Sequence, residues 1–492
     1  MMTQEQAFLK AQSQLHTLLD FVRQASQRHD RIDQVERGLF AQLLALGHSL
    51  LAGFVAAAGD GNVGDIAPAP DGATYRRLEE PHTRTYRSIF GPLAVERFVY
   101  GSREGQKIGW VPLDALLALP AGEFSYVLED WTQRLCLKGA FAEAATSLHD
   151  LLGLSVSVRS LEHQNQVIAQ ADFGAVRPLP GADEEGELLV VTADGKGVPM
   201  RRPPAGDTRS HHPRRGKGEK ANKKQMAYVG ALYTIDRFVR TPDDVLEEWA
   251  RQKRAQDRPT PCHKHVWAEM THVYEGDTYN GRINLFTHLV EQQQRRDPTE
   301  SKPAVCLLDG ERALWEMYRE FFPWAVGILD IFHVLERLWS AAYCFHPEKS
   351  QAAEGFVRTR LRLLLEGKVG YVIGGLRQML TKHRLRGSKA QALRQAIGYL
   401  ANNRAHMRYD VYLAAGYPIG SGVAEGACRH LVKDRLEQTG MRWCVTGAQA
   451  MLHVRATYLN GNWEEFVEYR VRREQRALYG THEAEPHQAM AA

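Results

Sequence analysis

Hydrophobic residues in the first part of the chain recur at helical spacing. Between residues 4 and 58 apolar side chains return every three or four positions, which predicts helices. The stretch 43–58 is strongly apolar, and it is interrupted by four small or polar residues: Gly47, His48, Ser49 and Gly53. We therefore interpret it as a buried helix and not as a membrane span. A linker rich in Gly, Asp and Pro follows at 59–72.

The next segments predict a β-hairpin and then two helices joined by a short turn. Residues 86–90 and 93–100 are rich in β-forming side chains and meet at Gly91-Pro92. Residues 141–152 and 158–170 each place apolar side chains on one helical face. This order is that of a helix-turn-helix, whose second helix would present four side chains to DNA: Arg159, His163, Gln164 and Gln166. Helical hairpins without a DNA role have the same pattern, so both interpretations stay open.

Beyond a connector at 174–186, the spacing changes to short apolar runs that each stop at an aspartate. The runs ELLVVTAD, AVCLLD and WAVGILD end at Asp194, Asp309 and Asp330. Continuous apolar runs of this length are typical of strands buried on both faces of a sheet. The runs QMAYVGALYTID and RFVR predict further strands, and we expect helices over 243–270 and around 283–293. This order of elements predicts an α/β fold.

The remainder of the chain is predicted to be helical. A helix, FHVLERLWSAAY, follows Asp330, and a block rich in Leu and Arg extends over 346–415. A glycine-rich turn at 420–422 then leads into a long helix that carries Glu425 in its first turn.

The acids at these strand ends are candidates for a common site, because ligands of α/β sheets bind at the carboxyl ends of the strands. Asp194, Asp309 and Glu425 would offer the oxygen ligands that Mg²⁺ prefers, and Mn²⁺ accepts the same donors. Two such ions about 4 Å apart hold the attacking and leaving oxygens of a phosphoryl displacement. Taken singly, each Asp-Gly pair is more typical of a turn, and the helix dipole favours any acid at the position of Glu425. The metal site is indicated only by the three acids together.

Asp330 competes with Asp309 for the second position of this site. It also ends an apolar run, and His333 and Arg337 follow it on one face of the next helix. We prefer Asp309 because a full helix and a further strand come after it, whereas Asp330 would leave too little sheet between the acids. The sequence leaves both interpretations open.

Local charge changes this picture more than overall composition does. The 492 residues, 44% hydrophobic and 24% charged, suit a soluble chain of two to four domains, and a net charge of +4 does not by itself indicate a polyanionic partner. Basic residues nevertheless gather after Asp194, in a Pro-containing loop that is either simply solvated or, as we favour, in contact with DNA phosphates. They are Lys196, Arg201, Arg202, Arg209, Arg214, Arg215, Lys217, Lys220, Lys223 and Lys224. Arg429 and Lys433 add cations near Glu425.

Two further features concern the compartment. The six cysteines form no CxxC pair, and the N-terminal residues lack the basic-then-apolar order of a secretory signal. We therefore expect a soluble, intracellular protein.

Several motifs together resemble one family. The strings TADGKGVPMRRP, GEKANKKQMAYVGALYTID, LLDGERALW, ILDIFHVLERLW and PIGSGVAEGACRHLVKDRLEQTGMRW look like those of bacterial insertion-sequence transposases of the ISKra type, a group similar to the DDE transposases. The resemblance covers about residues 86–468, and the joint pattern is more specific than any single motif. Related families often carry a cysteine pair after the hairpin, which is missing here at 100–104, so no zinc site is inferred.

The resemblance implies an RNase H-like mixed-sheet core with a catalytic, metal-binding triad of Asp194, Asp309 and Glu425. It implies that Asp330 and His333 support the site. The implied reaction is Mg²⁺-dependent transposition, with Mn²⁺ as the other candidate ion. Water cleaves a phosphodiester at the terminal inverted repeat, and the freed 3′-hydroxyl attacks target DNA. The implied partners are double-stranded DNA and further copies of the chain, in the cytoplasm at the nucleoid.

The domains expected on this basis follow one another along the chain. They are an N-terminal helical region (1–70), a hairpin and helix-turn-helix DNA-binding region (71–173), the first part of the catalytic core (187–345), a helical insertion (346–415), the last part of the core with C-terminal helices (416–475) and a disordered tail (476–492).

Two other functions remain compatible with the sequence. One is a domesticated DNA-binding protein that keeps the fold but no longer moves DNA. The other is a metal-dependent nuclease or phosphohydrolase without strand transfer.

Overall fold

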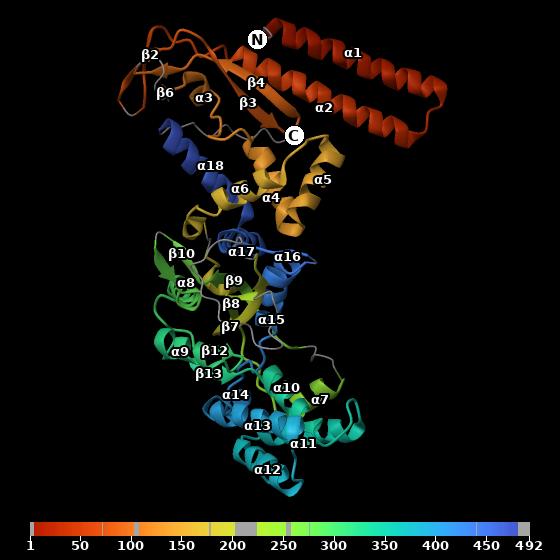
Figure 1. Ribbon diagram of the computed structural model, residues 1–492, viewed down its shortest axis with the longest axis vertical. Helices are drawn as coiled ribbons and strands as arrows, with labels where there is room; N and C mark the ends of the chain where they lie inside the picture. Colours follow the sequence, from red (N-terminus) through yellow and green to blue (C-terminus); the bar gives the residue numbers. More distant parts are fainter. Residues whose placement is uncertain are drawn as a thin grey trace. The chain divides into compact units, whose positions relative to one another are not determined.

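The computed structural model describes residues 4–70, 72–102, 108–176, 179–201, 224–251, 257–274, 276–438 and 440–480. The chain divides into two compact units (Figure 1). Unit 1 contains residues 1–176 and 463–492, and unit 2 contains residues 177–462.

Unit 1 begins with a helical hairpin, as the spacing predicts. Its helices are α1 (Gln4–Arg28) and α2 (Ile32–Ala57). They run antiparallel, as the contacts of Gly38 with Phe21 and of Gly53 with Phe8 show. The prediction that 43–58 is a buried helix is wrong, because α2 buries only Ser49, Gly53 and Val55. Its remaining apolar side chains are partly or fully exposed.

One helix of the described part, α2, is long and apolar enough to cross a membrane. This is a property of length and composition, which core helices of soluble proteins share. Val55 packs with Val95 and Leu113 in a small core, so α2 is also a packed element of unit 1.

Two small antiparallel sheets follow in unit 1. The predicted hairpin is confirmed as β3 (His82–Ser88) and β4 (Gly91–Arg97), and its turn lies at residues 89–90, two residues before the expected Gly91-Pro92. The second sheet has the strand order β1 (Ile66–Pro68), β2 (Thr74–Arg77), β5 (Tyr100–Gly101) and β6 (Ile108–Trp110). The short helix α3 (Pro112–Leu116) holds Asp114, which is buried between Arg84 and Arg97.

The helices of unit 1 include a segment from the far end of the sequence. They are α4 (Tyr126–Lys138), α5 (Phe141–Leu152), α6 (Val158–Ile168) and the C-terminal α18 (Trp463–Tyr479). Arg470 of α18 forms an ion pair with Glu129 of α4, and the Tyr479 hydroxyl donates to the Leu119 carbonyl at 2.5 Å. The last helix therefore packs within unit 1, whereas we expected it to complete the catalytic core.

Unit 2 is built on a mixed five-stranded sheet. The spatial order is β13 (Val326–Leu329), β12 (Ala304–Leu308), β7 (Leu188–Pro199), β8 (Lys224–Ile235) and β9 (Cys262–Met270). Strands β7, β8 and β9 are antiparallel neighbours, and β12 and β13 run parallel to β7. All five residues of β12 are buried, which agrees with the prediction of strands covered on both faces.

The third strand differs from the prediction. Residues 237–240 (RFVR) are not a strand, because the backbone amides of Phe238 and Arg240 bond to carbonyls in a later segment, at Gly416 and Leu413. The expected helix over 243–270 ends early, as α7 (Pro242–Arg251), and the strand β9 takes its second half.

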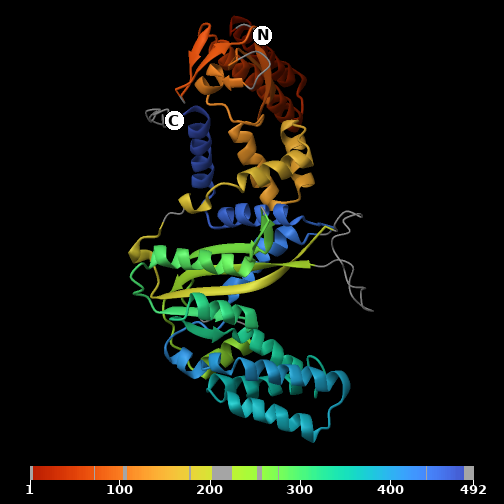
Figure 2. The same ribbon diagram turned by 60° about the vertical axis from the view of Figure 1, so that its left-hand side comes forward.

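Helices cover the sheet and extend from its parallel edge. Helix α8 (Gly281–Arg296) packs along β8 and β9, as Figure 2 shows, and α17 (Val445–Leu459) packs on β9. Helices α9 (Arg312–Phe321) and α10 (Ile331–Ala342) follow β12 and β13. The predicted helical block is confirmed as α11 (Gln351–Leu365), α12 (Val369–Lys382), α13 (Gly387–Asn402) and α14 (Tyr409–Ala414).

Candidate active site

The three aspartates that end the apolar runs lie side by side at one edge of the sheet. Ala193 of β7 pairs with Leu308 of β12, and Leu308 pairs with Leu329 of β13. Each of these residues immediately precedes an aspartate. Asp194, Asp309 and Asp330 therefore follow the last positions at which β7 pairs with β12 and β12 pairs with β13. Neighbouring strands are about 4.8 Å apart, which places the backbone of Asp309 next to that of Asp194 and Asp330 one strand further away.

Asp194 is partly exposed and lies within β7, which continues beyond it in pairing with β8. One carboxylate oxygen accepts from the following amide of Gly195 at 2.6 Å. The other accepts from the thiol of Cys428, whose sulfur is 3.4 Å away. Burial raises the pKa of the Cys428 thiol, and the charge of Lys196 partly opposes this rise. Lys196 follows Asp194 by two residues and lies on the same face of the strand.

Asp309 sits in a tight turn at the end of β12. Its carboxylate accepts from the amide of Glu311 at 2.8 Å, and Gly310 follows with a φ of +91°, a conformation that favours glycine. The backbone carbonyl of Asp309 accepts from the Tyr399 hydroxyl at 2.5 Å. The turn of Asp309 is thus held by α13, a helix of the insertion.

The insertion also supports the end of β13. The hydroxyl of Tyr409 donates to the Leu329 carbonyl at 2.8 Å, directly before Asp330, and this tyrosine is fully buried. Two tyrosines of the helical block therefore hold the backbone on which Asp309 and Asp330 stand.

Asp330 differs from the other two aspartates because it is fully buried. One oxygen accepts from the amide of Phe332 at 2.9 Å and caps α10, and the other accepts from the Ser421 hydroxyl. Its side chain is engaged in holding β13, α10 and residue 421 together. This geometry favours a supporting position for Asp330 and leaves Asp309 as the more accessible acid.

Glu425 joins the acids from a helix that begins after the glycine-rich turn. The element is α15 (Gly422–Ala427), which continues as a π-helix over Cys428–Lys433 and then α16 (Asp434–Leu436). The predicted long helix is thus interrupted by wider turns, of a kind that recurs at functional sites. Glu425 is exposed and Cys428, one turn later, is buried against Asp194.

The charges of these carboxylates affect one another's pKa values. Burial raises the pKa of Asp309, the charge of Asp194 raises it further, and His333 opposes both. The pKa of Glu425 is also raised, first by burial and then by the charges of Asp330 and Asp194, again with His333 lowering it. Like charges crowded at one place disfavour ionisation, and a bound cation would relieve that cost.

His333 belongs to α10, the helix that Asp330 caps. Its Nδ1 is 3.6 Å from a carboxylate oxygen of Glu336, one turn later on α10. Burial also raises the pKa of Asp330, and His333 lowers it. His333 is therefore placed to act on several acids at once.

The donor set suits a hard divalent cation, because it consists of carboxylate oxygens. Within the described ranges, however, no three His, Cys, Asp or Glu side chains already lie close enough to hold a metal ion. Coordination by all three predicted ligands would require side-chain rotation.

The basic residues predicted near the acids are placed in part. Arg429 and Lys433 are exposed, with Arg429 Nε 3.7 Å from an Asp434 oxygen, and Lys224 forms an ion pair with Glu437. Seven basic residues of the predicted DNA-binding loop lie outside the described residues: Arg202, Arg209, Arg214, Arg215, Lys217, Lys220 and Lys223.

The helix-turn-helix candidates lie in unit 1. Helices α5 and α6 form as predicted, with Gly153 in the left-handed conformation after α5, and Arg159 and His163 are exposed on α6. The prediction that Gln164 contacts DNA is wrong for this arrangement. Its side chain is buried and accepts a hydrogen bond from Thr132 of α4, because it lies on the face of α6 that packs inward with Leu161.

Sequence reasoning missed four contributors to the site: Cys428, Ser421, Tyr399 and Tyr409. Cys428 follows Glu425 by three residues, so helical spacing could have indicated it. Ser421 belongs to the recognised glycine-rich turn. The two tyrosines carry no local signal, because their partners are backbone carbonyls far away in the sequence.

Comparison with known proteins gives little independent information. No protein-family model matches the sequence, and no curated protein matches it. Among solved structures, the chain is similar to one titled "Drosophila P element transposase strand transfer complex", with 9% identity and a TM-score of 0.25. The match covers 73% of this chain and 82% of the other. A likeness this distant leaves the function to be argued from the residues.

Proposed function

We propose that this chain is a DNA transposase of an insertion sequence, of the ISKra type, that cleaves and joins DNA with the help of divalent cations. One observation carries the proposal. Asp194 and Asp309 follow paired residues on adjacent parallel strands, and Glu425 lies one turn before Cys428, whose thiol donates to Asp194. Acids from three distant parts of the sequence are thus linked at the same end of the sheet.

The sheet supports an RNase H-like core. Its first three strands in sequence are antiparallel, and the next two extend the sheet in parallel on the other side of β7. The first and second acids then follow β7 and β12, and the third comes from a helix after the insertion. This is the arrangement that the resemblance to DDE transposases implies.

In this proposal Asp194, Asp309 and Glu425 hold Mg²⁺, with Mn²⁺ as an alternative. The ion would polarise the phosphate and favour ionisation of the attacking water or 3′-hydroxyl. The protein's own part is to hold the acids in place. Asp330 caps α10 and fixes Ser421, His333 balances the local negative charge, and Tyr399 fixes the backbone of Asp309.

The proposed partner is double-stranded DNA, both as terminal inverted repeats and as target. Lys196 follows Asp194 by two residues, Arg429 and Lys433 are exposed on the helix after Glu425, and Arg159 and His163 are exposed on the candidate recognition helix of unit 1. Such side chains can contact phosphates and base edges. Cleavage and joining of two element ends also favour a homo-oligomer.

The test is Mg²⁺-dependent cleavage of a DNA that carries the element's own end. We expect Asp194→Asn, Asp309→Asn and Glu425→Gln each to lower cleavage by at least about 1000-fold, because each removes a ligand charge while leaving the basic surface intact. Binding to the same DNA, measured by anisotropy, should change by less than about threefold.

Asp330→Asn is the matched variant, since it neutralises an aspartate at the same sheet edge. It should reduce cleavage far less than Asp309→Asn, and the reverse order would assign the second acid to Asp330. Equal nicking of a plasmid without the element end would indicate a nuclease. End binding without any cleavage by the wild type would indicate a domesticated DNA-binding protein.

A further inference from the structure

The helical hairpin of unit 1 carries an apolar surface that faces solvent. Several large hydrophobic side chains of α1 and α2 are exposed, and six of them, between 39% and 61% exposed, lie on one side of the hairpin. We name them the hairpin stripe: Leu15, Leu19 and Val22 from α1, and Leu43, Leu50 and Phe54 from α2. Contiguous exposed apolar patches of this kind mark interaction sites.

The members of the hairpin stripe follow the residues that join the two helices. In α1 the buried residues are Ala7, Ala11, Leu18 and Ala25, at four- and seven-residue spacing, and Leu19 comes one position after Leu18. In α2, Leu50 and Phe54 follow the buried Ser49 and Gly53 in the same way. Each helix therefore has two adjacent apolar stripes, one turned toward its partner helix and one turned outward.

Both outward stripes lie on the same side of the hairpin. One residue further along an α-helix is about 100° further around its axis. Because α1 and α2 are antiparallel, this rotation is clockwise in one helix and anticlockwise in the other when both are viewed from one end. The two rotations bring the stripes to a common face of the helix pair, whose two helices lie side by side in Figure 1.

We propose that the hairpin stripe is the interface with a second copy of this chain, and that two hairpins pack face to face as a four-helix bundle. The 4-3 spacing of Leu15, Leu19 and Val22 is that of helices packing by knobs into holes. A face of 25 residues in length and two helices in width offers on the order of 750 Å², close to the roughly 800 Å² that each partner buries in a stable dimer. The inference does not depend on the proposed function.

The charges of the hairpin favour a protein partner over a membrane. Its two helices contain four basic and four acidic side chains, so the hairpin lacks the basic polar face that binds anionic lipid. In addition, α2 is fixed on another side, because His48 is 3.0 Å from the Pro92 carbonyl and Val55 packs with Val95. A helix held in this way belongs to a folded unit.

The test is the oligomeric state of the full chain without DNA, measured by sedimentation equilibrium. We expect a dimer at micromolar concentration that Leu19→Glu weakens at least 100-fold, because each copy would bury an unpaired charge. Leu43→Glu in α2 should act similarly. The matched control is Leu9→Glu, which makes the same change at an exposed leucine of α1 that lies off the stripe, and it should change the dissociation constant less than threefold.

Three outcomes would overturn the proposal. The first is a wild type that stays monomeric at roughly 100 μM, well above the micromolar concentration at which we expect the dimer. The second is a dimer that Leu19→Glu and Leu43→Glu leave intact. The third is a monomer that binds anionic vesicles in a flotation assay and loses this binding in Leu19→Glu. Circular dichroism spectra at room temperature should be equal for Leu19→Glu and Leu9→Glu, because both positions are exposed and neither change should unfold the hairpin. Asp309→Asn should sediment like the wild type, so a failure of the proposed catalysis would leave this result unchanged.

Discussion

The two ends of the five-stranded sheet treat their carboxylates in opposite ways. At the end that carries Asp194 and Asp309, acids lie near one another and the pKa values of Asp309 and Glu425 are raised. At the other end, Glu185 precedes β7 and receives two hydrogen bonds from Arg296, at 2.8 and 2.5 Å, and one from Thr234. Burial raises the pKa of Glu185, but these bonds outweigh it and the pKa is lowered.

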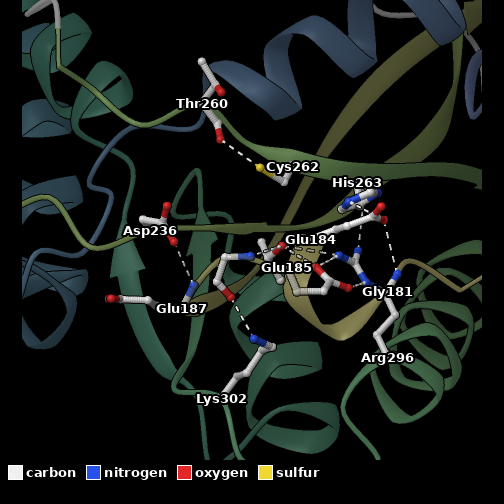
Figure 3. A network of polar contacts seen from close by, with 12 residues as sticks. Gly181, Glu184, Glu185, Glu187, Asp236, Thr260, Cys262, His263, Arg296 and Lys302 are labelled. Atoms are coloured by element: carbon white, nitrogen blue, oxygen red, sulfur yellow. Dashed lines mark hydrogen bonds and ion pairs between the residues drawn. The ribbon is translucent and has the colours of Figure 1, made fainter.

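Figure 3 shows how closely the Glu185 end is connected. Arg296 also donates to the His263 carbonyl at 2.9 Å, and Lys302 donates to the Gly186 carbonyl at 2.8 Å. These bonds join the start of β7 to β9, α8 and the segment before β12. The comparison indicates that one end of the sheet holds the fold together, while the other keeps unpaired negative charge that a ligand could use.

The largest expected effect on stability is at the Glu185 end. Arg296→Met should lower the free energy of unfolding by about 3–5 kcal/mol in urea titrations, because it leaves a buried carboxylate unpaired. The effect should shrink as pH falls through the lowered pKa of Glu185, since protonation removes the charge that Arg296 compensates.

The control for this variant is Arg312→Met, which breaks an exposed pair with Glu316 and should cost less than about 0.5 kcal/mol. If Arg296→Met lowered the free energy of unfolding by as little as Arg312→Met, the ion pair of Glu185 would contribute no more to stability than an exposed surface pair.

An intermediate effect is expected where the helical insertion holds the acidic end. Tyr409→Phe and Tyr399→Phe should each lower the free energy of unfolding by about 1–2 kcal/mol, because each leaves a backbone carbonyl without its donor. Tyr399→Phe should also slow cleavage, because its partner is the carbonyl of Asp309. Tyr371→Phe changes an exposed tyrosine of the same insertion and should leave both quantities unchanged. Equal stability of all three variants would contradict the supporting role.

The smallest effect has the opposite sign. Asp309→Asn should raise the melting temperature by about 1–3 °C at pH 7 to 8, because it removes a desolvated charge beside Asp194. An acid with a raised pKa is stabilising when protonated, and that contribution is lost as pH rises through its folded pKa. The gain of Asp309→Asn should therefore disappear at low pH.

Mg²⁺ provides the second half of this measurement. It should raise the melting temperature of the wild type more than that of Asp309→Asn, because binding to the native state stabilises it. Glu320→Gln, an exposed acid on α9, is the control and should respond to Mg²⁺ like the wild type. A larger Mg²⁺ response in Asp309→Asn would exclude Asp309 as a ligand.

The sequence predicted the strands that are buried on both faces better than it predicted their neighbours. Leu188 to Asp194 and Ala304 to Asp309 are continuous apolar runs, and their placement follows from that pattern. β9 was missed because CHKHVWAEM has polar residues throughout and is defined by pairing with β8. The C-terminal helix α18 was assigned to the wrong unit because its partners, Glu129 and Leu119, are more than 300 residues away.

The candidate acids could be named from the sequence because strand ends and motifs are local features. Their relation could not, because it depends on the pairing of Ala193 with Leu308. The burial of Gln164 could not be predicted from the sequence either, because it depends on packing against Thr132 of another helix.

The length of the β7–β8 pair beyond Asp194 has a consequence for how this protein can vary. Five residue pairs, from Gly195 with Tyr228 to Pro199 with Lys224, continue the ladder past the acid. Side chains alternate between the faces of a strand, so adding or removing a single residue here would turn every later side chain to the opposite face. Among relatives of this chain, insertions and deletions within this arm should therefore occur in steps of two residues.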